Sequence, residues 1–175
     1  MSKIGKKNIL IPKDSSIKIE GADLTISGPK GTKKLTINDK IFSSKLNESE
    51  FQLQPIEKTI DKKTSIMWGT YRSLINNAIM GVSIGHEKIL ELNGVGFRAN
   101  LKGDVLNLQI GFSHDVNFKI PKEIKITVEK QTIIKITGVD KELVTKIAAD
   151  IKNLKPVEPY KAKGIKERGQ FVLRK

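Results

Sequence analysis

The hydrophobic pattern of the chain changes its period twice, and this change constrains the fold more than any other feature. Between residues 9 and 53 apolar and polar residues alternate, as in Ile17-Lys18-Ile19. A period of two indicates strands with one buried face. Between residues 67 and 82 apolar residues instead recur every three or four positions, which indicates an amphipathic helix. The first half is therefore predicted to be a small antiparallel sheet closed by one helix.

The same succession of patterns returns in the second half. Alternation resumes between residues 87 and 137, and an apolar helical stripe runs from 143 to 154. Asp140 is placed to cap this helix at its N-terminus. Pro156 ends the helix, because the residue before a proline is pushed away from the helical conformation. A second sheet with one packed helix is the prediction for this half.

A domain boundary is predicted near residue 86, where Gly81 and Gly85 end the first helix. A weak internal repeat also supports two related domains. In each half of the chain a proline and a glycine frame two Ile-rich runs. The proline and the glycine are 16 positions apart in the first half (12–28) and 17 apart in the second (121–138). We therefore predict an α+β fold of two similar small domains, each an antiparallel sheet with one packed helix. The predicted ranges are 1–85 for the N-terminal domain, 86–154 for the C-terminal domain and 155–175 for a basic tail.

The charge of the chain predicts an anionic partner. Lys and Arg number 32 against 19 Asp and Glu, so the net charge is +13 and the pI is near 9.8. Nucleic acid is the usual partner of such a chain. A membrane surface is the weaker alternative, and a spanning helix is not expected, because no apolar run approaches the roughly 20 residues that it needs. The chain has no cysteine, so disulfides and thiolate chemistry are excluded.

The predicted tail carries seven cations and two carboxylates in 21 residues. Pro156 and Pro159 stop the preceding helix, and Gly164 and Gly169 leave the backbone able to lie along another surface. The cations would contact phosphates, while the interleaved apolar residues would either pin the segment to its domain or stack on a base. A solvated basic tail is the alternative interpretation. The alternating residues are the cations Lys161, Lys163, Lys166 and Arg168 and the apolar Tyr160, Ile165 and Phe171.

Five stretches of the chain resemble one known family. The run EPYKAKGI at residues 158–165 is similar to the C-terminal signature of the ribosomal large-subunit protein six family. The resemblance spans nearly the whole chain in order, although Val157 and Ala162 stand where the signature usually has proline and glycine, and Asn8 where proline is usual. The other matching stretches are SKIGKK at 2–7, GPKG at 28–31, WGT to INN at 68–77 and LNGVGFRA at 92–99.

This resemblance implies a structural protein of the large ribosomal subunit that binds large-subunit rRNA. It further implies a position near the sarcin–ricin loop, where translation factors dock, with other large-subunit ribosomal proteins as neighbours. Neither DNA nor a membrane is an expected partner. The expected location is the ribosome of a bacterial cytoplasm or of a mitochondrion or plastid. A free-standing RNA-binding regulator or RNA chaperone is the alternative.

The predicted rRNA-binding residues lie on the second domain and its tail. Two of them occupy the polar face of a strand that follows the Gly94–Gly96 turn, and we expect them to lie beside the tail. An ordinary solvated strand face is the alternative for these two. The predicted set is Arg98, Lys102, Lys155, Tyr160, Lys161, Lys163, Gly164, Lys166, Arg168, Arg174 and Lys175.

No catalytic residue, metal ligand or cofactor is predicted. GVGFRA at 94–99 fits a dinucleotide-binding spacing, but that motif needs a helix after it, and here a strand pattern follows; we interpret Asn93-Gly94 as a hairpin turn. Ser113-His114-Asp115 has the residue types of a catalytic triad, yet sequence neighbours cannot form that relay, so a turn is expected. Trp68 and Phe97 are predicted to be core residues.

Overall fold

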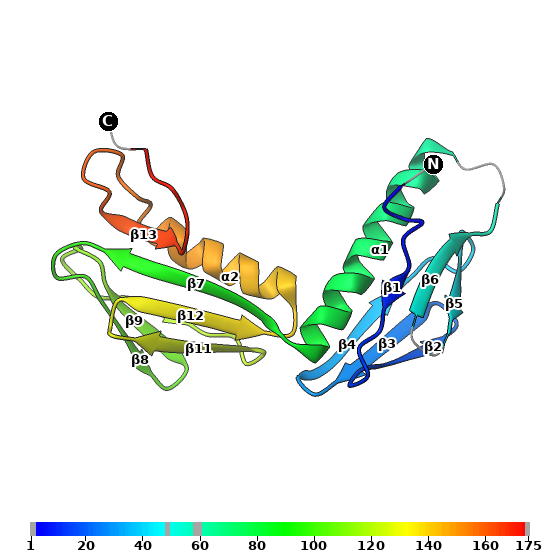
Figure 1. Cartoon of the computed structure of the whole chain (residues 1–175). Coiled ribbons are helices and arrows are strands. Elements are labelled where there is room, and N and C mark those ends of the chain that lie inside the picture. Colours follow the sequence, from blue (N-terminus) through cyan, green and yellow to red (C-terminus); the bar gives the residue numbers. More distant parts are fainter. Residues whose placement is uncertain (1–2, 48–49, 58–60, 174–175) are drawn as a thin grey trace. The chain divides into compact units, whose positions relative to one another are not determined.

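The computed structural model describes residues 3–47, 50–57 and 61–173. The chain divides into two compact units, Met1–Gly85 and His86–Lys175. Each unit combines antiparallel sheets with one helix (Figure 1). The predicted α+β class is therefore confirmed.

The first unit holds two three-stranded sheets, ordered β2-β3-β4 and β1-β6-β5, where one sheet was predicted. The chain leaves the first sheet after Ile37, whose amide donates to Ala22 O, and a turn follows in which the Phe42 amide donates to Asn38 O. This turn redirects the next hairpin into a separate sheet. The strands are β1 (Ile9–Leu10), β2 (Ser16–Glu20), β3 (Asp23–Gly28), β4 (Gly31–Thr36), β5 (Phe42–Leu46) and β6 (Glu50–Pro55).

Helix α1 (Lys62–Ser83) covers this unit and supplies much of its core. The Asp61 side chain accepts a hydrogen bond from the Lys62 amide at the start of the helix. Gly85, with φ of +89°, follows its end and donates to Met80 O, whereas Gly81 is buried inside the helix and does not end it as predicted. The predicted core position of Trp68 is confirmed, because its side chain is 4% exposed and its Nε1 donates to Leu53 O at 2.7 Å.

The second unit has a four-stranded sheet, β11-β12-β7-β13, and a three-stranded sheet, β10-β9-β8. Helix α2 (Lys141–Leu154) packs on β7, β12 and β13, and Asp140 accepts from the Glu142 amide as the predicted N-cap. Both sheets and α2 contribute to one core, to which Phe97 belongs as predicted. The strands are β7 (His86–Asn93), β8 (Arg98–Lys102), β9 (Val105–Gln109), β10 (Val116–Lys119), β11 (Ile124–Glu129), β12 (Ile133–Gly138) and β13 (Gly164–Glu167).

The internal repeat falls on two equivalent hairpins. In β2–β3 Ile17 stands opposite Ile26, and in β11–β12 Ile126 stands opposite Ile136. Cross-strand pairs of this kind are the local unit of sheet stability. The repeated Ile-rich runs therefore build the same hairpin in each unit.

The connection from β7 to β8 is not the predicted hairpin. A strand does follow Gly96, but β7 pairs with β12 and β13 while β8 pairs with β9, so the turn links two different sheets. A Cβ on Gly94 would lie 2.8 Å from the Phe97 ring. The glycine thus leaves room for the ring to fold back into the core between the sheets.

The predicted tail is partly a strand. β13 pairs antiparallel with β7 at the edge of the four-stranded sheet, where β13 lies beside α2 and β7 (Figure 1). Ile165 is fully buried. The open sheet edge and the buried isoleucine draw Gly164–Glu167 into the fold, so Ile165 pins the segment to its domain, which is one of the two roles predicted for the apolar residues of the tail.

Candidate nucleic-acid interface

Residues 155–163, named here the C-terminal loop, form a closed structure between α2 and β13. Backbone hydrogen bonds run from the Glu158 amide to Lys163 O at 2.9 Å and from the Ala162 amide to Glu158 O at 3.0 Å. The Ile165 amide closes the base of the loop by donating to Lys155 O at 2.9 Å. These bonds hold the loop in one conformation, so its side chains are presented from a defined backbone.

Gly164 is sterically required at the base of this loop. Its φ is +140°, and a Cβ there would lie 2.7 Å from Pro156 O and from the Cα of Val157. The sequence predicted a flexible position at Gly164. The structure instead shows a buried position where the backbone of the loop entrance passes too close for any side chain.

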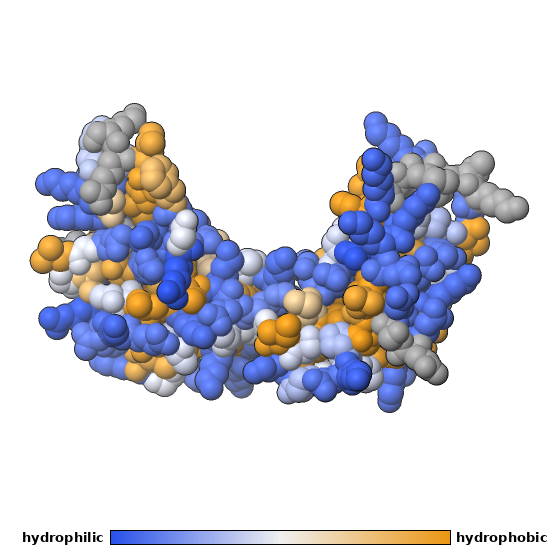
Figure 2. Space-filling model, in the orientation of Figure 1, coloured by the Kyte–Doolittle hydropathy of each residue, from blue (hydrophilic) through white to orange (hydrophobic). Residues whose placement is uncertain are grey.

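The C-terminal loop directs cations outward. Lys161, Lys163 and, just beyond β13, Arg168 are exposed. Tyr160 is 64% exposed and Phe171 is 85% exposed, so Ile165 alone of the three interleaved apolar residues pins the segment. Figure 2 shows that the surface of this unit is mainly hydrophilic, with exposed hydrophobic groups among the hydrophilic ones. Exposed cations beside exposed rings suit the sugar–phosphate backbone and the bases of an RNA.

Lys166 differs from its neighbours because its charge is already paired. Its Nζ lies 3.1 Å from the Glu91 carboxylate on β7. Lys166 stays a predicted phosphate contact, but its charge already has a partner in the protein. Strand pairing places Lys166 directly opposite Glu91, which explains the ion pair.

Glu167 joins three elements of the second unit. Its carboxylate accepts from Lys88 of β7 at 2.7 Å and from Lys152 of α2 at 3.1 Å. The hydrogen bond from Lys88, and then that from Lys152, holds the pKa of the Glu167 carboxyl below its ordinary value of 4.5. Two cations are consequently used to fasten β13 and are not directed at a ligand.

Lys155 connects the C-terminal loop with a second loop, which consists of residues 110–115 between β9 and β10. Its Nζ lies 4.7 Å from the centroid of the Phe112 ring, a cation–π distance. The Phe112 ring is stacked with the His114 ring, with centroids 6.2 Å apart and 16° between the planes. Phe112 remains 46% exposed. The structure thus gathers a cation, a phenyl ring and an imidazole at the surface.

The two predicted cations of β8 lie at opposite ends of that strand. Arg98 stands opposite Gln109, the last residue of β9 before the 110–115 loop, and is exposed. Lys102 stands at the other end, opposite Val105. β8 itself lies against β11, whereas β13 occupies the opposite edge of that sheet. The prediction that both cations lie beside the tail is therefore wrong for Lys102, and Arg98 adjoins the 110–115 loop.

Sequence reasoning missed Phe112 and His114 as candidate binding residues. The available signal was a phenyl ring and an imidazole two positions apart in a segment that bends at residues 111–114. Ser113-His114-Asp115 was correctly predicted as a turn and not as a catalytic relay. The predicted residues Arg174 and Lys175 lie outside the described residues.

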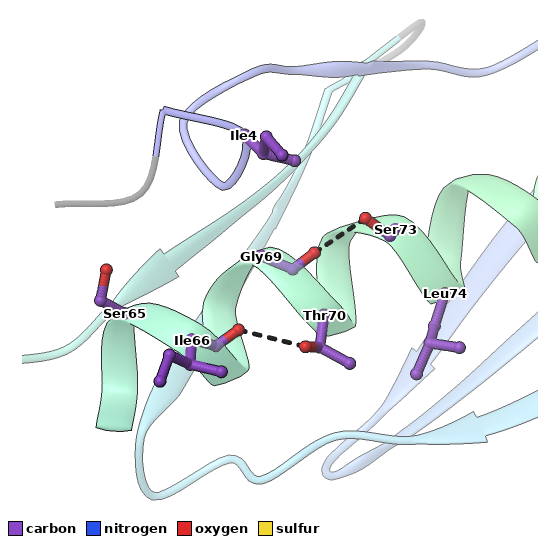
Figure 3. A pocket seen from close by; sticks show the side chains of 7 residues that line it. All are labelled: Ile4, Ser65, Ile66, Gly69, Thr70, Ser73 and Leu74. Atoms are coloured by element: carbon purple, nitrogen blue, oxygen red, sulfur yellow. Dashed lines mark hydrogen bonds between the residues drawn. The ribbon is translucent and has the colours of Figure 1, made fainter. Parts of the chain in front are cut away.

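A groove of about 580 Å³ lies on the first unit, between Ile4 and the surface of α1 (Figure 3). The Thr70 hydroxyl donates to Ile66 O and the Ser73 hydroxyl to Gly69 O, so both are used within the helix. Within the part of the chain that the structure describes, no ionisable side chain lines the groove. The lining residues are Ile4, Ser65, Ile66, Gly69, Thr70, Ser73 and Leu74.

Among the described residues no group of three or more His, Cys, Asp and Glu side chains could hold a metal ion. No helix in the described ranges is long and apolar enough to cross a membrane. The fold and the site together define a basic, two-unit α+β protein whose candidate site offers positive charge and aromatic rings.

Comparison with known proteins names the family. The model of the family "Ribosomal protein L6" matches twice, at residues 11–85 and 93–168. Proteins called large ribosomal subunit protein uL6 from Caulobacter vibrioides and Beijerinckia indica are 45% and 43% identical over the whole chain and 97% of their own length. The uL6 protein of Novosphingobium aromaticivorans is 43% identical with the same coverage. This chain belongs to the ribosomal protein L6 family, and it is a structural ribosomal protein and not an enzyme.

Proposed function

We propose that this protein is a constituent of the large ribosomal subunit and binds large-subunit rRNA mainly through residues 86–175. The observation that supports this most strongly is the C-terminal loop, in which a hydrogen-bonded backbone presents Lys161 and Lys163 to solvent. A pre-formed cationic loop loses little conformational entropy on binding, so more of the contact energy contributes to affinity.

The mechanism is neutralisation of phosphates by lysine and arginine with release of condensed counterions. Arg168 extends the exposed cationic surface beyond β13, and Arg98 adds a cation next to the 110–115 loop. Folded RNA is recognised largely through the shape of its backbone, which suits cations held on a fixed loop. Binding should therefore depend strongly on salt.

The family signature at residues 158–165 supports a finer proposal. We place the second unit near the sarcin–ricin loop, with translation factors docking nearby and other large-subunit proteins as neighbours. Bacterial relatives at 40–45% identity support a bacterial ribosome as the location.

Co-sedimentation through a high-salt wash tests this function. The protein should remain with large subunits, because an integral constituent makes many contacts at once. A free-standing RNA regulator would instead leave the particles and appear in the supernatant. That outcome would overturn the proposal.

Separate fragments test the division of roles between the units. The fragment of residues 86–175 should bind large-subunit rRNA, and the fragment of residues 1–85 should bind it much more weakly. Filter binding at one salt concentration, with circular dichroism to verify folding, measures both. Equal affinities would contradict the assignment of the main contact surface to the second unit.

A further inference from the structure

We propose that Phe112 and His114, together with Lys155, form a stacking site for an unpaired nucleobase of the bound RNA. This proposal rests on the proposed function, since it names a second kind of contact on the same RNA. It adds a base contact to the phosphate contacts of the C-terminal loop.

The ring pair has the geometry of a small platform. The Phe112 and His114 planes are 16° from parallel, with centroids 6.2 Å apart, and Phe112 is 46% exposed with its neighbours in place. Part of this aromatic surface is therefore open to a ligand. Every nucleobase has a flat face that stacks on such rings, so the site accepts bases without reading their sequence.

The platform stands on a rigid base. Ile110 is 1% exposed, and the Cβ position of Gly111 lies 3.2 Å from the Phe97 ring, so the loop enters from the core. At its exit Gln109 Nε2 donates to the Asp115 carboxylate at 3.4 Å. Because both ends of the loop are held, a stacking base would not have to order the loop first.

The charges around the platform favour RNA over an apolar protein segment. Lys155 lies over the Phe112 ring, and its carbonyl closes the C-terminal loop that carries Lys161 and Lys163. Arg98 stands opposite Gln109 at the base of the platform loop. A base on the rings would therefore have cations nearby for its flanking phosphates, whereas an apolar peptide would leave those cations without partners.

A comparison of two RNA probes with the full-length chain tests the proposal. The probes are an octamer of riboadenosine and an octamer of ribose phosphate that lacks bases, and anisotropy measures both. Phe112→Leu removes the aromatic face but keeps an apolar side chain. It should weaken binding to the riboadenosine octamer by about 5- to 150-fold, the range measured for loss of one stacked base. Binding to the baseless octamer should not change.

Matched variants identify the origin of any loss. Leu101→Ala, at another exposed apolar side chain of the same unit, should leave both affinities unchanged, and Phe112→Trp should preserve base binding. The proposal would be overturned if Phe112→Leu bound both probes as the wild type does, or if it lost the same affinity for both. The rings would then serve to stabilise the loop or to contact a protein. Failure of the wild-type chain to bind either probe or large-subunit rRNA would overturn the proposed function itself, which is a distinguishable result.

Discussion

The C-terminal loop and β13 are adjacent parts of one basic segment, yet they use their charges in opposite ways. In the loop Lys161 and Lys163 are exposed on a closed backbone. In β13 Lys166 pairs with Glu91, and Glu167 accepts from two lysines of the same unit. Composition alone makes the two parts look alike. The comparison teaches that a cation is available to a partner only where the fold leaves it without an ion pair.

The largest expected effect concerns the junction of the two parts. Gly164→Ala should destabilise the second unit by roughly 2–5 kcal/mol, because it adds a backbone clash to a strained φ. Gly169→Ala is the matched control, since Gly169 also has a positive φ of +82° but no atom lies within 4 Å of its Cβ position. Denaturant unfolding measures both. Equal losses would show that the close approach to Pro156 and Val157 is not what requires glycine.

The next effect separates exposed from paired lysines. Lys161→Gln and Lys163→Gln should each weaken binding to large-subunit rRNA and flatten the plot of log affinity against log salt by roughly 1 unit. Lys166→Gln should change the slope much less, because its Nζ is 3.1 Å from Glu91. A salt titration of the three variants measures this. A Lys166→Gln slope as flat as the other two would mean that the ion pair opens on binding.

A smaller effect should appear as a pH dependence of stability. The pKa of Glu167 is lowered by Lys88 and Lys152, so its stabilisation is complete above the ordinary value of 4.5 and is lost as the pH falls through the lower folded pKa. Glu167→Gln should cost about 0.5–1 kcal/mol at pH 7. Melting temperatures between pH 7 and pH 3 should show the gap to wild type closing at the acid end. A gap that stays constant would contradict the assignment.

The smallest effect is expected within the C-terminal loop. Ala162, which stands where the family usually has glycine, has φ of +52° and is 8% exposed. Ala162→Gly removes about 1 kcal/mol of strain from the left-handed backbone of the folded protein. It also raises the conformational entropy of the unfolded chain, which costs a similar free energy on folding. Its unfolding free energy should therefore stay within about 1 kcal/mol of wild type. A larger change would mean that the Ala162 methyl packs more tightly than its position suggests.

The local features of the molecule could be predicted from the sequence. Period-two runs specify which side chains share a face of a strand, and the change to helical spacing specifies α1 and α2. The Asp140 cap and the core positions of Trp68 and Phe97 followed from the same local rules, and all three are confirmed. The signature at residues 158–165 identified the family before any fold was known.

Strand pairing and the ion pairs between distant residues, in contrast, depend on the tertiary fold. β7 and β8 are neighbours in sequence but belong to different sheets, and β13 adds to the far edge of one of them. Those pairings place Glu91 against Lys166 and bring Lys155 to Phe112 across a separation of 43 residues. The hydrophobic period of a segment constrains its own conformation. Which strand it pairs with depends on the free energy of packing against segments that are distant in sequence, and a local sequence pattern gives no information on that free energy.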